Sequence, residues 1–405
     1  MIPSKKRIIE SSLVIVLTLF GLSGCTNKFN QTGKWLVAYD STLIPLTFDS
    51  DSQSVKIITS QVNLGSANGA NDTVLCLGAV PWTEADMLMG FYGIDSVYYA
   101  TSIISAQVIL QRSIYELQPN GYDVRNIQLE GYVIDSGWTA STVTWDSLAR
   151  LPRESSNMIL APTMPEVSDT SVVFQIDTSV VRRWAKAAQD TNYNNYGFII
   201  KSSNVSGVVS VYSNAYAGTG SEPMIEVVCV INGVTDTVIS TSSYSTYVAN
   251  TSIVAPSQTF ALQSGTGLHA SVVFNLDSIR RVSVLDSIPA FSVVNYAELT
   301  LHEDPIDSLY SGQSPDSLWA YYQADPSTHA ISLSGYSLST KVGRKYTFPA
   351  TVMVQQMLIS GNYGFLITRS EDINNLDSRF IYNENAPDSL KPRLTITYTP
   401  AVKKK

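Results

Sequence analysis

Short runs of alternating apolar and polar residues dominate the chain after its first 50 positions. The clearest runs span residues 55–58, 73–80, 87–92, 105–111 and 128–134. Turn-forming residues such as Pro119-Asn120-Gly121 separate them. Alternation with a period of two places one set of side chains on each face of a strand. Many short strands without long helical periodicity predict an all-β protein built as a sandwich or jelly roll.

Two segments carry a helical pattern instead. In the first, Asp177-Thr178 offers an N-cap, and in the second Thr351 does so. The apolar faces are formed by Val180, Val181, Trp184 and Ala188 in the first segment and by Val354, Met357 and Leu358 in the second. We therefore expect one short helix in each half of the chain.

A short string that follows each helical segment occurs twice. Residues 195–202 read Asn-Tyr-Gly-Phe-Ile-Ile-Lys-Ser, and residues 362–370 repeat the order of their apolar, polar and glycine positions. A repeat at this distance indicates duplication of a domain rather than a solenoid. The sequence predicts two tandem jelly-roll-like β-sandwich domains at 51–238 and 239–400, each with one short helix, and a basic tail at 401–405.

The amino terminus has the features of an export signal. Lys5, Lys6 and Arg7 precede a short apolar run, and the small residues before Cys25 resemble a bacterial lipobox. This pattern predicts a lipoprotein signal peptide at 1–24, a mature chain that starts at lipidated Cys25, and a tether at 25–50. The alternative is an ordinary signal peptide followed by an incidental cysteine. Because Thr26 follows the cysteine, we expect an outer-membrane lipoprotein whose periplasmic or surface orientation stays open.

Composition and charge narrow the classes of function. Charged residues make up 15% of the chain and the net charge is −8, so we expect no nucleic-acid binding, which needs a concentrated basic surface. In an exported chain, Cys76 and Cys229 could form a disulfide or stay as two buried thiols packed as small hydrophobic groups.

A set of motifs resembles one family of extracellular domains. Trp138-Thr139-Ala140-Ser141-Thr142-Val143-Thr144-Trp145, followed by Leu151-Pro152, is similar to the W-x-x-S-T-V-T-W signature of DNRLRE (disaggregatase-related) domains, also classed as carbohydrate-binding module family 96. The segments 105–110, 174–184, 195–202 and 391–398 resemble further landmarks of that family, in the family's order. The second half lacks the signature and resembles a degenerate copy.

The resemblance implies an extracellular β-sandwich on a glycan-active or surface protein. It implies no catalytic constellation. The family's Pro-Arg-Leu is replaced by Pro223-Met224-Ile225 in the first half, whereas Pro392-Arg393-Leu394 stands in the second.

The sequence offers few candidates for catalysis or metal binding. The three histidines, His269, His302 and His329, have no metal-ligand spacing, and His302, Glu303 and Asp304 adjoin on one strand, where neighbours point to opposite faces. Many of the aspartates lie in Asp-Ser pairs typical of turns. We expect no enzyme activity and no cofactor, although one such loop could hold a structural Ca²⁺.

Aromatic side chains are the candidates for sugar binding. The candidates in loops are Tyr98, Tyr99, Tyr193, Tyr216 and Tyr310, whereas Trp138, Trp145 and Trp184 are expected in the core. The preferred hypothesis is an envelope-anchored lipoprotein that contacts the membrane through its lipid and binds polysaccharide without catalysis. One alternative is a structural or adhesive surface protein, and a second is a polysaccharide-degrading enzyme related to disaggregatase.

Overall fold

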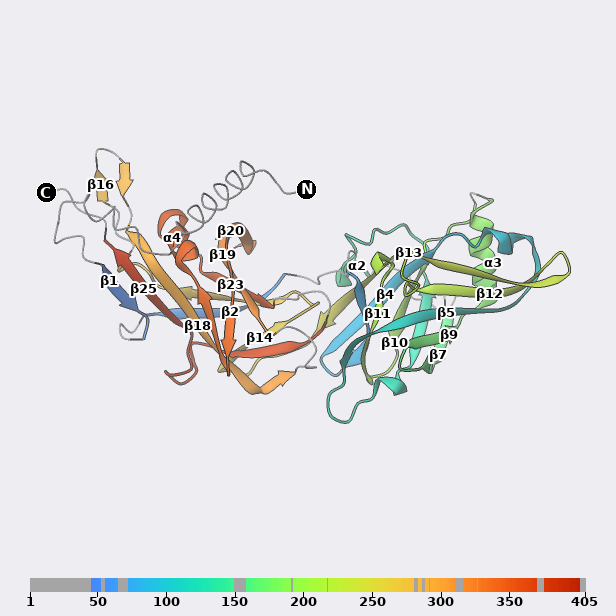
Figure 1. Cartoon of the computed structure of the whole chain (residues 1–405), viewed down its shortest axis with the longest axis horizontal. Helices are drawn as coiled ribbons and strands as arrows, with labels where there is room; N and C mark the ends of the chain where they lie inside the picture. The colour runs from blue at the N-terminus through green and yellow to red at the C-terminus, as the bar shows by residue number, and fades with distance from the viewer. Residues whose placement is uncertain are drawn as a thin grey trace, which may run out of the picture. The chain divides into compact units, whose positions relative to one another are not determined.

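Strands make up most of the described structure. The computed structural model describes residues 45–400, apart from 52–54, 65–71, 149–157, 191, 217, 280–282, 286–287, 291, 310–315, 326 and 370–374. Three short helices accompany two large antiparallel sheet assemblies, so the prediction of an all-β fold is confirmed (Figure 1). Within these residues, no helix is both long and apolar enough to cross a bilayer.

One set of strands forms the first sandwich. Its strands are β3 (Val74–Val80), β4 (Thr83–Phe91), β5 (Ala100–Leu117), β6 (Leu129–Val133), β7 (Met158–Thr163), β8 (Glu166–Val167), β9 (Ser171–Gln175), β10 (Phe198–Ser202), β11 (Gly207–Tyr212), β12 (Met224–Ile231) and β13 (Val234–Thr251). The order in the sheet is β13-β12-β5-β11-β3-β4-β10-β6-β7, and β9 joins β5 to β8. The long strands β5 and β13 each change partners along their length. β13 pairs with β12 and then with β4, and so connects the two layers.

The remaining strands form the second sandwich. They are β1 (Leu46–Asp49), β2 (Ile57–Asn63), β14 (Thr259–Gln263), β15 (Leu268–Phe274), β18 (Val293–Leu309), β19 (Leu318–Asp325), β20 (Ala330–Leu338), β21 (Thr340–Val342), β22 (Lys345–Pro349), β23 (Phe365–Arg369), β24 (Ser378–Tyr382) and β25 (Arg393–Thr399). A separate hairpin consists of β16 (Ser283–Leu285) and β17 (Ile288–Ala290). The order is β1-β25-β18-β24-β14-β15-β23-β19-β20, and β18 passes from one layer to the other as β5 does in the first sandwich.

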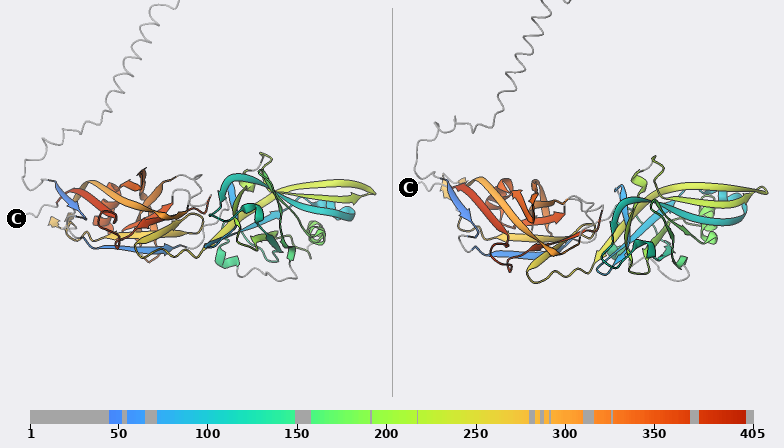
Figure 2. Two further views of the ribbon diagram at one scale, coloured as in Figure 1. Left: turned by 90° about the horizontal axis from the view of Figure 1, so that it is seen from below. Right: turned by 60° about the horizontal axis from the view of Figure 1, so that its bottom comes forward.

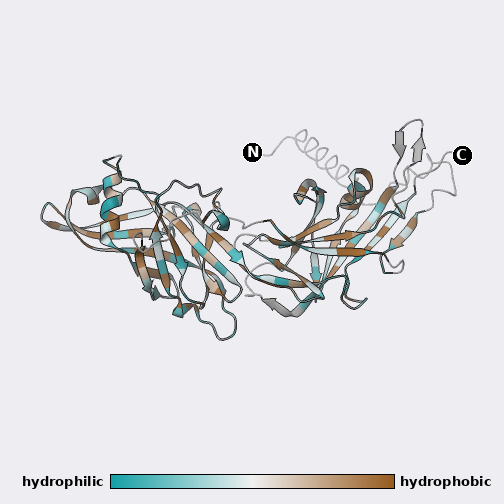
Figure 3. Cartoon of the chain, turned by 180° about the vertical axis from the view of Figure 1, so that it is seen from behind, coloured by the Kyte–Doolittle hydropathy of each residue, from teal (hydrophilic) through white to brown (hydrophobic). Residues whose placement is uncertain are grey.

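Each sandwich buries its own apolar core between its two layers. Val108 and Leu110 of β5 point into the first core, and Leu299 and Leu301 of β18 point into the second. Their chain neighbours on the strands face outward, and brown and teal bands alternate along many strands in Figure 3. The alternation of the sequence is therefore the alternation between core and surface.

Both predicted helices form. In α3 (Thr178–Ala187), the Asp177 carboxylate accepts a hydrogen bond of 2.8 Å from the Ser179 amide, which confirms the predicted N-cap. In α4 (Thr351–Ser360), the predicted cap by Thr351 is wrong, because the N-cap residue is Ala350 and has no side-chain cap. The Thr351 hydroxyl instead accepts a hydrogen bond from the Ala297 amide of β18. A third helix, α2 (Trp145–Leu148), is a single turn.

The repeated Asn-Tyr-Gly-Phe string has the same role in both sandwiches. Asn195 donates a hydrogen bond of 2.7 Å to the Phe91 carbonyl at the end of β4, and Asn362 donates one of 2.5 Å to the Phe274 carbonyl at the end of β15. Gly197 has a φ of +75°, and a Cβ there would lie 2.1 Å from the Met89 carbonyl oxygen. The string therefore fixes the start of a core strand, β10 or β23, against its neighbour.

Strand pairing divides the chain differently from the ranges expected from the sequence. The expected boundary at 238–239 falls inside β13, which belongs to the first sandwich as far as Thr251. In addition, β1 lies within the expected tether, yet β1 and β2 pair with β25 and β15 of the second sandwich. Alternation predicts that a segment is a strand but does not name its partner strand, which explains the difference.

Candidate ligand-binding surface of the second sandwich

Three aromatic side chains lie together on the outer face of the second sandwich. We call Trp319 and Tyr321 of β19 and Tyr336 of β20 the aromatic cluster. The intervening residues Leu318 and Ala320 are fully buried in the core, so Trp319 and Tyr321 point away from it. Tyr336 is the direct antiparallel partner of Tyr321 and therefore shares its face. Antiparallel pairing alone brings the three rings together.

The three rings are in mutual contact. The ring centroids are 6.1 Å apart for Trp319 and Tyr321, 5.4 Å for Trp319 and Tyr336, and 6.0 Å for Tyr321 and Tyr336. Tyr336 is 55% exposed, and the neighbouring Leu338 is 43% exposed. Each such aromatic pair contributes about 0.5–1.5 kcal/mol of interaction energy, so the three contacts together hold the rings in place by a few kcal/mol at most. The cluster is thus a preformed apolar surface rather than a set of independent side chains.

Polar groups adjoin the aromatic cluster along β19. Gln323 lies two residues after Tyr321 and donates a hydrogen bond of 2.6 Å to the Ser271 hydroxyl of β15. The Nδ1 atom of His329 lies 3.3 Å from Oε1 of the Gln323 side chain. Gln323 is buried, whereas His329 is partly exposed. An imidazole at the rim of an aromatic surface can donate or accept a hydrogen bond to a ligand hydroxyl.

The first sandwich is built differently at the corresponding place. Strands β23 and β19 of the second sandwich correspond to β10 and β6 of the first. Thr368 therefore corresponds to Lys201, and Trp319 corresponds to Glu130. There, Lys201 and Glu130 form an ion pair of 2.9 Å instead of an aromatic surface. The aromatic cluster is therefore specific to the second sandwich.

Trp184 and the two tryptophans of the W-x-x-S-T-V-T-W signature, Trp138 and Trp145, do not form an exposed surface. Trp184 stacks on Phe198 in the main core, which agrees with the prediction. Trp138 and Trp145 pack partly buried against a small apolar cluster on the outer side of β4, β6, β10 and β13. The Trp138 indole donates a hydrogen bond of 2.7 Å to the Tyr196 carbonyl. The signature segment therefore covers the outer face of β6 and β10. The equivalent face of the second sandwich, formed by β19 and its neighbours β20 and β23, carries the aromatic cluster instead.

The tyrosines selected from the sequence do not converge on one site. Tyr98 and Tyr99 are 44% and 63% exposed and meet edge to face, with ring centroids 5.3 Å apart. Tyr193 lies under the Lys186 ammonium, and Tyr216 stacks on Tyr212. Among the described residues, no ring contact joins these three places. Tyr310 lies outside the described residues, as does Cys25.

Sequence reasoning missed the aromatic cluster although its signal was present. The string Leu318-Trp319-Ala320-Tyr321 alternates, so both aromatic side chains share one face. The missing element was the partner strand, because only the register with β20 shows that Tyr336 joins them.

The two cysteines of the first sandwich are free. Cys76 in β3 and Cys229 in β12 are both fully buried and unbonded to each other, so they do not form a disulfide in this structure. Burial raises the pKa of the Cys76 thiol, which keeps it protonated and unreactive. The two thiols pack as small hydrophobic groups.

His302 and Glu303 lie on opposite faces of β18, as expected from strand geometry. His302 lines a polar surface cavity of about 550 Å³ together with Glu298, Thr300, Lys345 and Arg393. Burial lowers the pKa of His302, although a hydrogen bond with the backbone of Leu390 acts in the opposite direction. The other side chains lining this cavity include both acids and bases, and Arg393 is held by Asp49 of β1.

Glu303 belongs to a partly buried network of charges in the second sandwich. Arg379 of β24 lies 3.2 Å from one carboxylate oxygen of Glu303, and Lys341 of β21 contacts the other. Asp316 accepts hydrogen bonds from Lys341 and from the Tyr346 hydroxyl, at 2.6 and 2.8 Å. Burial opposes ionisation of Asp316, but these hydrogen bonds outweigh it and lower its pKa. Lys341 and Arg379 each contact both Glu303 and Asp316, so each of the two carboxylates has two cationic partners.

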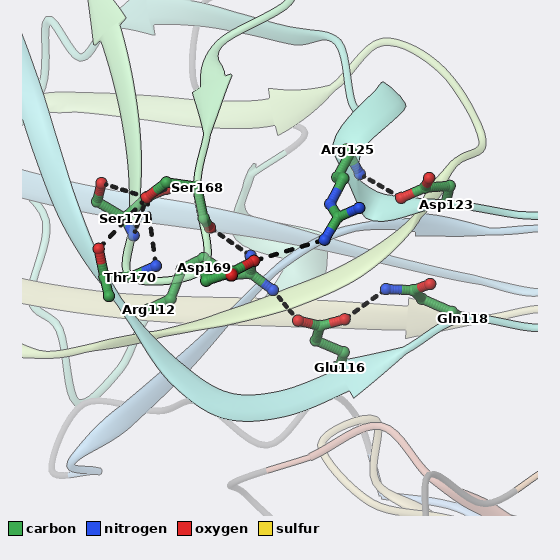
Figure 4. A network of polar contacts seen from close by, with 9 residues as sticks. All are labelled: Arg112, Glu116, Gln118, Asp123, Arg125, Ser168, Asp169, Thr170 and Ser171. Atoms are coloured by element: carbon green, nitrogen blue, oxygen red, sulfur yellow. Dashed lines mark hydrogen bonds and ion pairs between the residues drawn. The ribbon is translucent and has the colours of Figure 1, made fainter.

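A charged residue also lies at the matching place of the first sandwich. Arg112 of β5 forms an ion pair with Glu116 and donates a hydrogen bond to the Ser168 carbonyl (Figure 4). An Asp169 carboxylate in the same turn lies 3.4 Å from Arg125, and both side chains are exposed. Burial lowers the pKa of Arg112. In the described parts of the chain, no group of three or more histidine, cysteine or acidic side chains is placed to hold a metal ion.

Comparison with known proteins gives no relative that informs on this surface. No protein family matches the chain, and no curated protein matches it. Among solved structures, the chain is similar to the Gt strain of infectious bursal disease virus at 10% identity, with 90% of this chain and 78% of that chain covered and a TM-score of 0.13. The VP2 subviral particle of that virus gives 10% identity, 91% and 79% coverage, and a TM-score of 0.13. A likeness this weak carries no argument about fold or function.

Proposed function

We propose that the protein is an envelope-anchored lipoprotein that binds polysaccharide without catalysis, and that the aromatic cluster is its binding surface. The observation that carries the proposal is the contact of Trp319, Tyr321 and Tyr336 on an outer face of the second sandwich. The motif resemblance to DNRLRE domains in the first half of the chain supports the same class of function.

The chemistry of the cluster suits a carbohydrate. The faces of sugar rings present C–H groups that pack on aromatic rings, while hydroxyls at the ring edges need hydrogen-bond partners. The Tyr321 and Tyr336 rings bring phenol groups, and His329 adds an imidazole beside Gln323. Aromatic side chains with polar ends are well suited to a surface that is both apolar and wet. Rings already held by one another lose little conformational entropy when a ligand binds.

Gel retardation by immobilised polysaccharides tests the binding. The full chain, purified in detergent, is run through gels that contain neutral or anionic polysaccharides. We expect retardation by at least one polymer and its loss in Trp319→Ala. A matched control, Tyr98→Ala with Tyr99→Ala, removes an exposed aromatic pair of the first sandwich and should leave retardation unchanged. Absence of retardation by every polymer would contradict the proposal and favour the structural or adhesive alternative, whereas release of oligosaccharides would favour the enzyme alternative.

Membrane anchoring has a separate test. Two or three acyl chains on Cys25 supply enough buried CH₂ groups, at about 0.8 kcal/mol each, for stable attachment. The Cys25→Ala variant should therefore leave the membrane fraction that holds the wild-type protein. Retention of the variant in membranes would contradict lipidation at Cys25.

A further inference from the structure

The first strands of the described residues, β1 and β2, complete the second sandwich rather than the first. In the views of Figure 2, the blue strands β1 and β2 run beside orange and red strands of the second sandwich. β1 pairs with β25, with Thr47 opposite Thr397, and β2 pairs with β15, with Gln61 opposite Ala270. The pair β1–β2 therefore spans both layers of the second sandwich.

In the first sandwich, β13 has the same role. Its first half pairs with β12, with Thr237 opposite Val228, and its second half pairs with β4, with Tyr247 opposite Met87. β12 and β25 each lie beside the crossing strand, β5 or β18, and β4 and β15 each lie beside the Tyr-Gly-Phe strand, β10 or β23. β13 and β1–β2 thus occupy equivalent places, and we call them the two spanning segments.

Each spanning segment precedes, in the sequence, the sandwich that it does not complete. Asn63 pairs with Leu268 of β15, and Ala249 pairs with Ala85, the equivalent residue of β4. In the sequence, Asn63 lies 22 residues before Ala85, and Ala249 lies 19 residues before Leu268. The chain therefore reads as two tandem repeats, each composed of a spanning segment and a sandwich body. In the folded chain, each segment joins the body of the other repeat.

The two spanning segments are held with unequal strength. In β13, Tyr247, Val248 and Ala249 are almost completely buried. In β1 and β2 one residue each, Phe48 and Val62, is buried, whereas the other described residues are partly or fully exposed. At roughly 1.5–3 kcal/mol for each buried apolar side chain, β1–β2 gains much less from burial than β13.

Polar contacts nevertheless make the place of β1–β2 specific. Asp49 accepts hydrogen bonds from both Nε, at 3.0 Å, and Nη2 of Arg393. The Gln61 side chain donates to the carbonyls of Ala261 and His269 and accepts from the Ala261 amide at 2.9 Å. A second copy of the chain carries the same Asp49 and Gln61. Its spanning segment can therefore make the same hydrogen bonds to the second sandwich of the first copy.

We propose that β1–β2 is an exchangeable spanning segment, and that the place it fills in the second sandwich accepts β1–β2 from a second copy of this chain. Exchange of an identical element preserves every backbone and side-chain contact of the place, so it needs little new interface energy. An unfilled place would expose the edges of β15 and β25, which are templates for strand addition. The partner is therefore another copy of the protein.

Cysteine cross-linking between copies tests the exchange. One full-length variant carries Thr47→Cys and another carries Thr397→Cys, and the two are mixed, oxidised and searched by mass spectrometry for a disulfide between positions 47 and 397. Both residues lie on the outer face, and directly opposed strand positions suit disulfide geometry. We expect this interchain link, with a yield that rises with protein concentration. In the double variant, the same link should form within one chain at high dilution.

The matched control uses the equivalent pair of the first sandwich. Mixed Thr237→Cys and Val228→Cys chains should give at least tenfold less interchain link, because the buried second half of β13, with Tyr247, Val248 and Ala249, holds the whole strand in its own chain. Three outcomes would overturn the proposal: no link between positions 47 and 397 of different chains at any concentration, failure of the double variant to close within its chain, or equal linking by the control pair.

Discussion

Arg112 and Glu303 occupy the same position of the two strands that cross between layers. The amide of Arg112 donates to the Thr170 carbonyl, and the amide of Glu303 donates to the Arg344 carbonyl, both at 2.8 Å. Their side chains carry opposite charges, and each is neutralised by local partners of its own sandwich. The duplicated backbone is therefore retained at this position, while the side-chain chemistry differs.

Removal of the Glu303 charge should destabilise the second sandwich. Glu303→Gln removes one of the negative charges that neutralise Arg379. The Arg379 and Glu303 side chains are only 4% and 6% exposed. Breaking a buried pair from one side costs about 3–5 kcal/mol. Denaturant unfolding should show this loss, whereas Asp169→Asn, in the exposed pair of Figure 4, should show none. Equal stability of Glu303→Gln and the wild type would show that the network contributes nothing to folding.

Gly197→Ala should be more damaging than Gly233→Ala. Both glycines have φ near +75–79°, a conformation that costs an L-residue about 1–2 kcal/mol. A Cβ at Gly233 meets nothing within 4 Å, but one at Gly197 would lie 2.1 Å from a backbone oxygen of β4. The difference between their unfolding free energies isolates the close approach. We expect it to exceed about 2 kcal/mol; similar losses at both sites would refute the explanation of the repeated string.

Acid should weaken the second sandwich through His269. Burial lowers the pKa of this side chain to about 4, from 6.5 in an exposed histidine. Between these values the unfolded chain binds more protons, so the stability from His269 is complete above pH 6.5 and is lost as pH falls towards 4. The shift corresponds to about 3 kcal/mol. Unfolding free energies measured from pH 4 to 7 should depend less on pH in His269→Gln; an unchanged slope would contradict this account.

Much of the fold could be predicted because its signals are local. The Asp177 cap, the apolar face of α3 and the core strand after Gly197 each depend on a few neighbouring residues. Strand partners depend on residues far apart in the sequence. Nothing in the pattern of residues 46–63 distinguishes a strand of the first sandwich from one of the second, so the placement of β1–β2 could not be predicted.

The candidate site shows the same limit. Tyr98 and Tyr99 were selected from the sequence because they lie outside strands, and they are exposed, yet the aromatic cluster formed elsewhere. Trp319 and Tyr321 lie on a strand, where an aromatic residue is normally half-buried. The cluster arises because β20 places Tyr336 opposite Tyr321, and this register is a tertiary property.

The central claim is that polysaccharide binds at the aromatic cluster. It is tested most directly by isothermal titration calorimetry with an oligosaccharide of whichever polymer retards the protein. The account predicts that Trp319→Ala and Tyr336→Ala each weaken binding about tenfold or more, a loss of about 1.4 kcal/mol. The paired Tyr98→Ala and Tyr99→Ala changes should leave affinity unchanged. Wild-type affinity in Trp319→Ala, or an equal loss in the Tyr98 and Tyr99 variant, would contradict the claim.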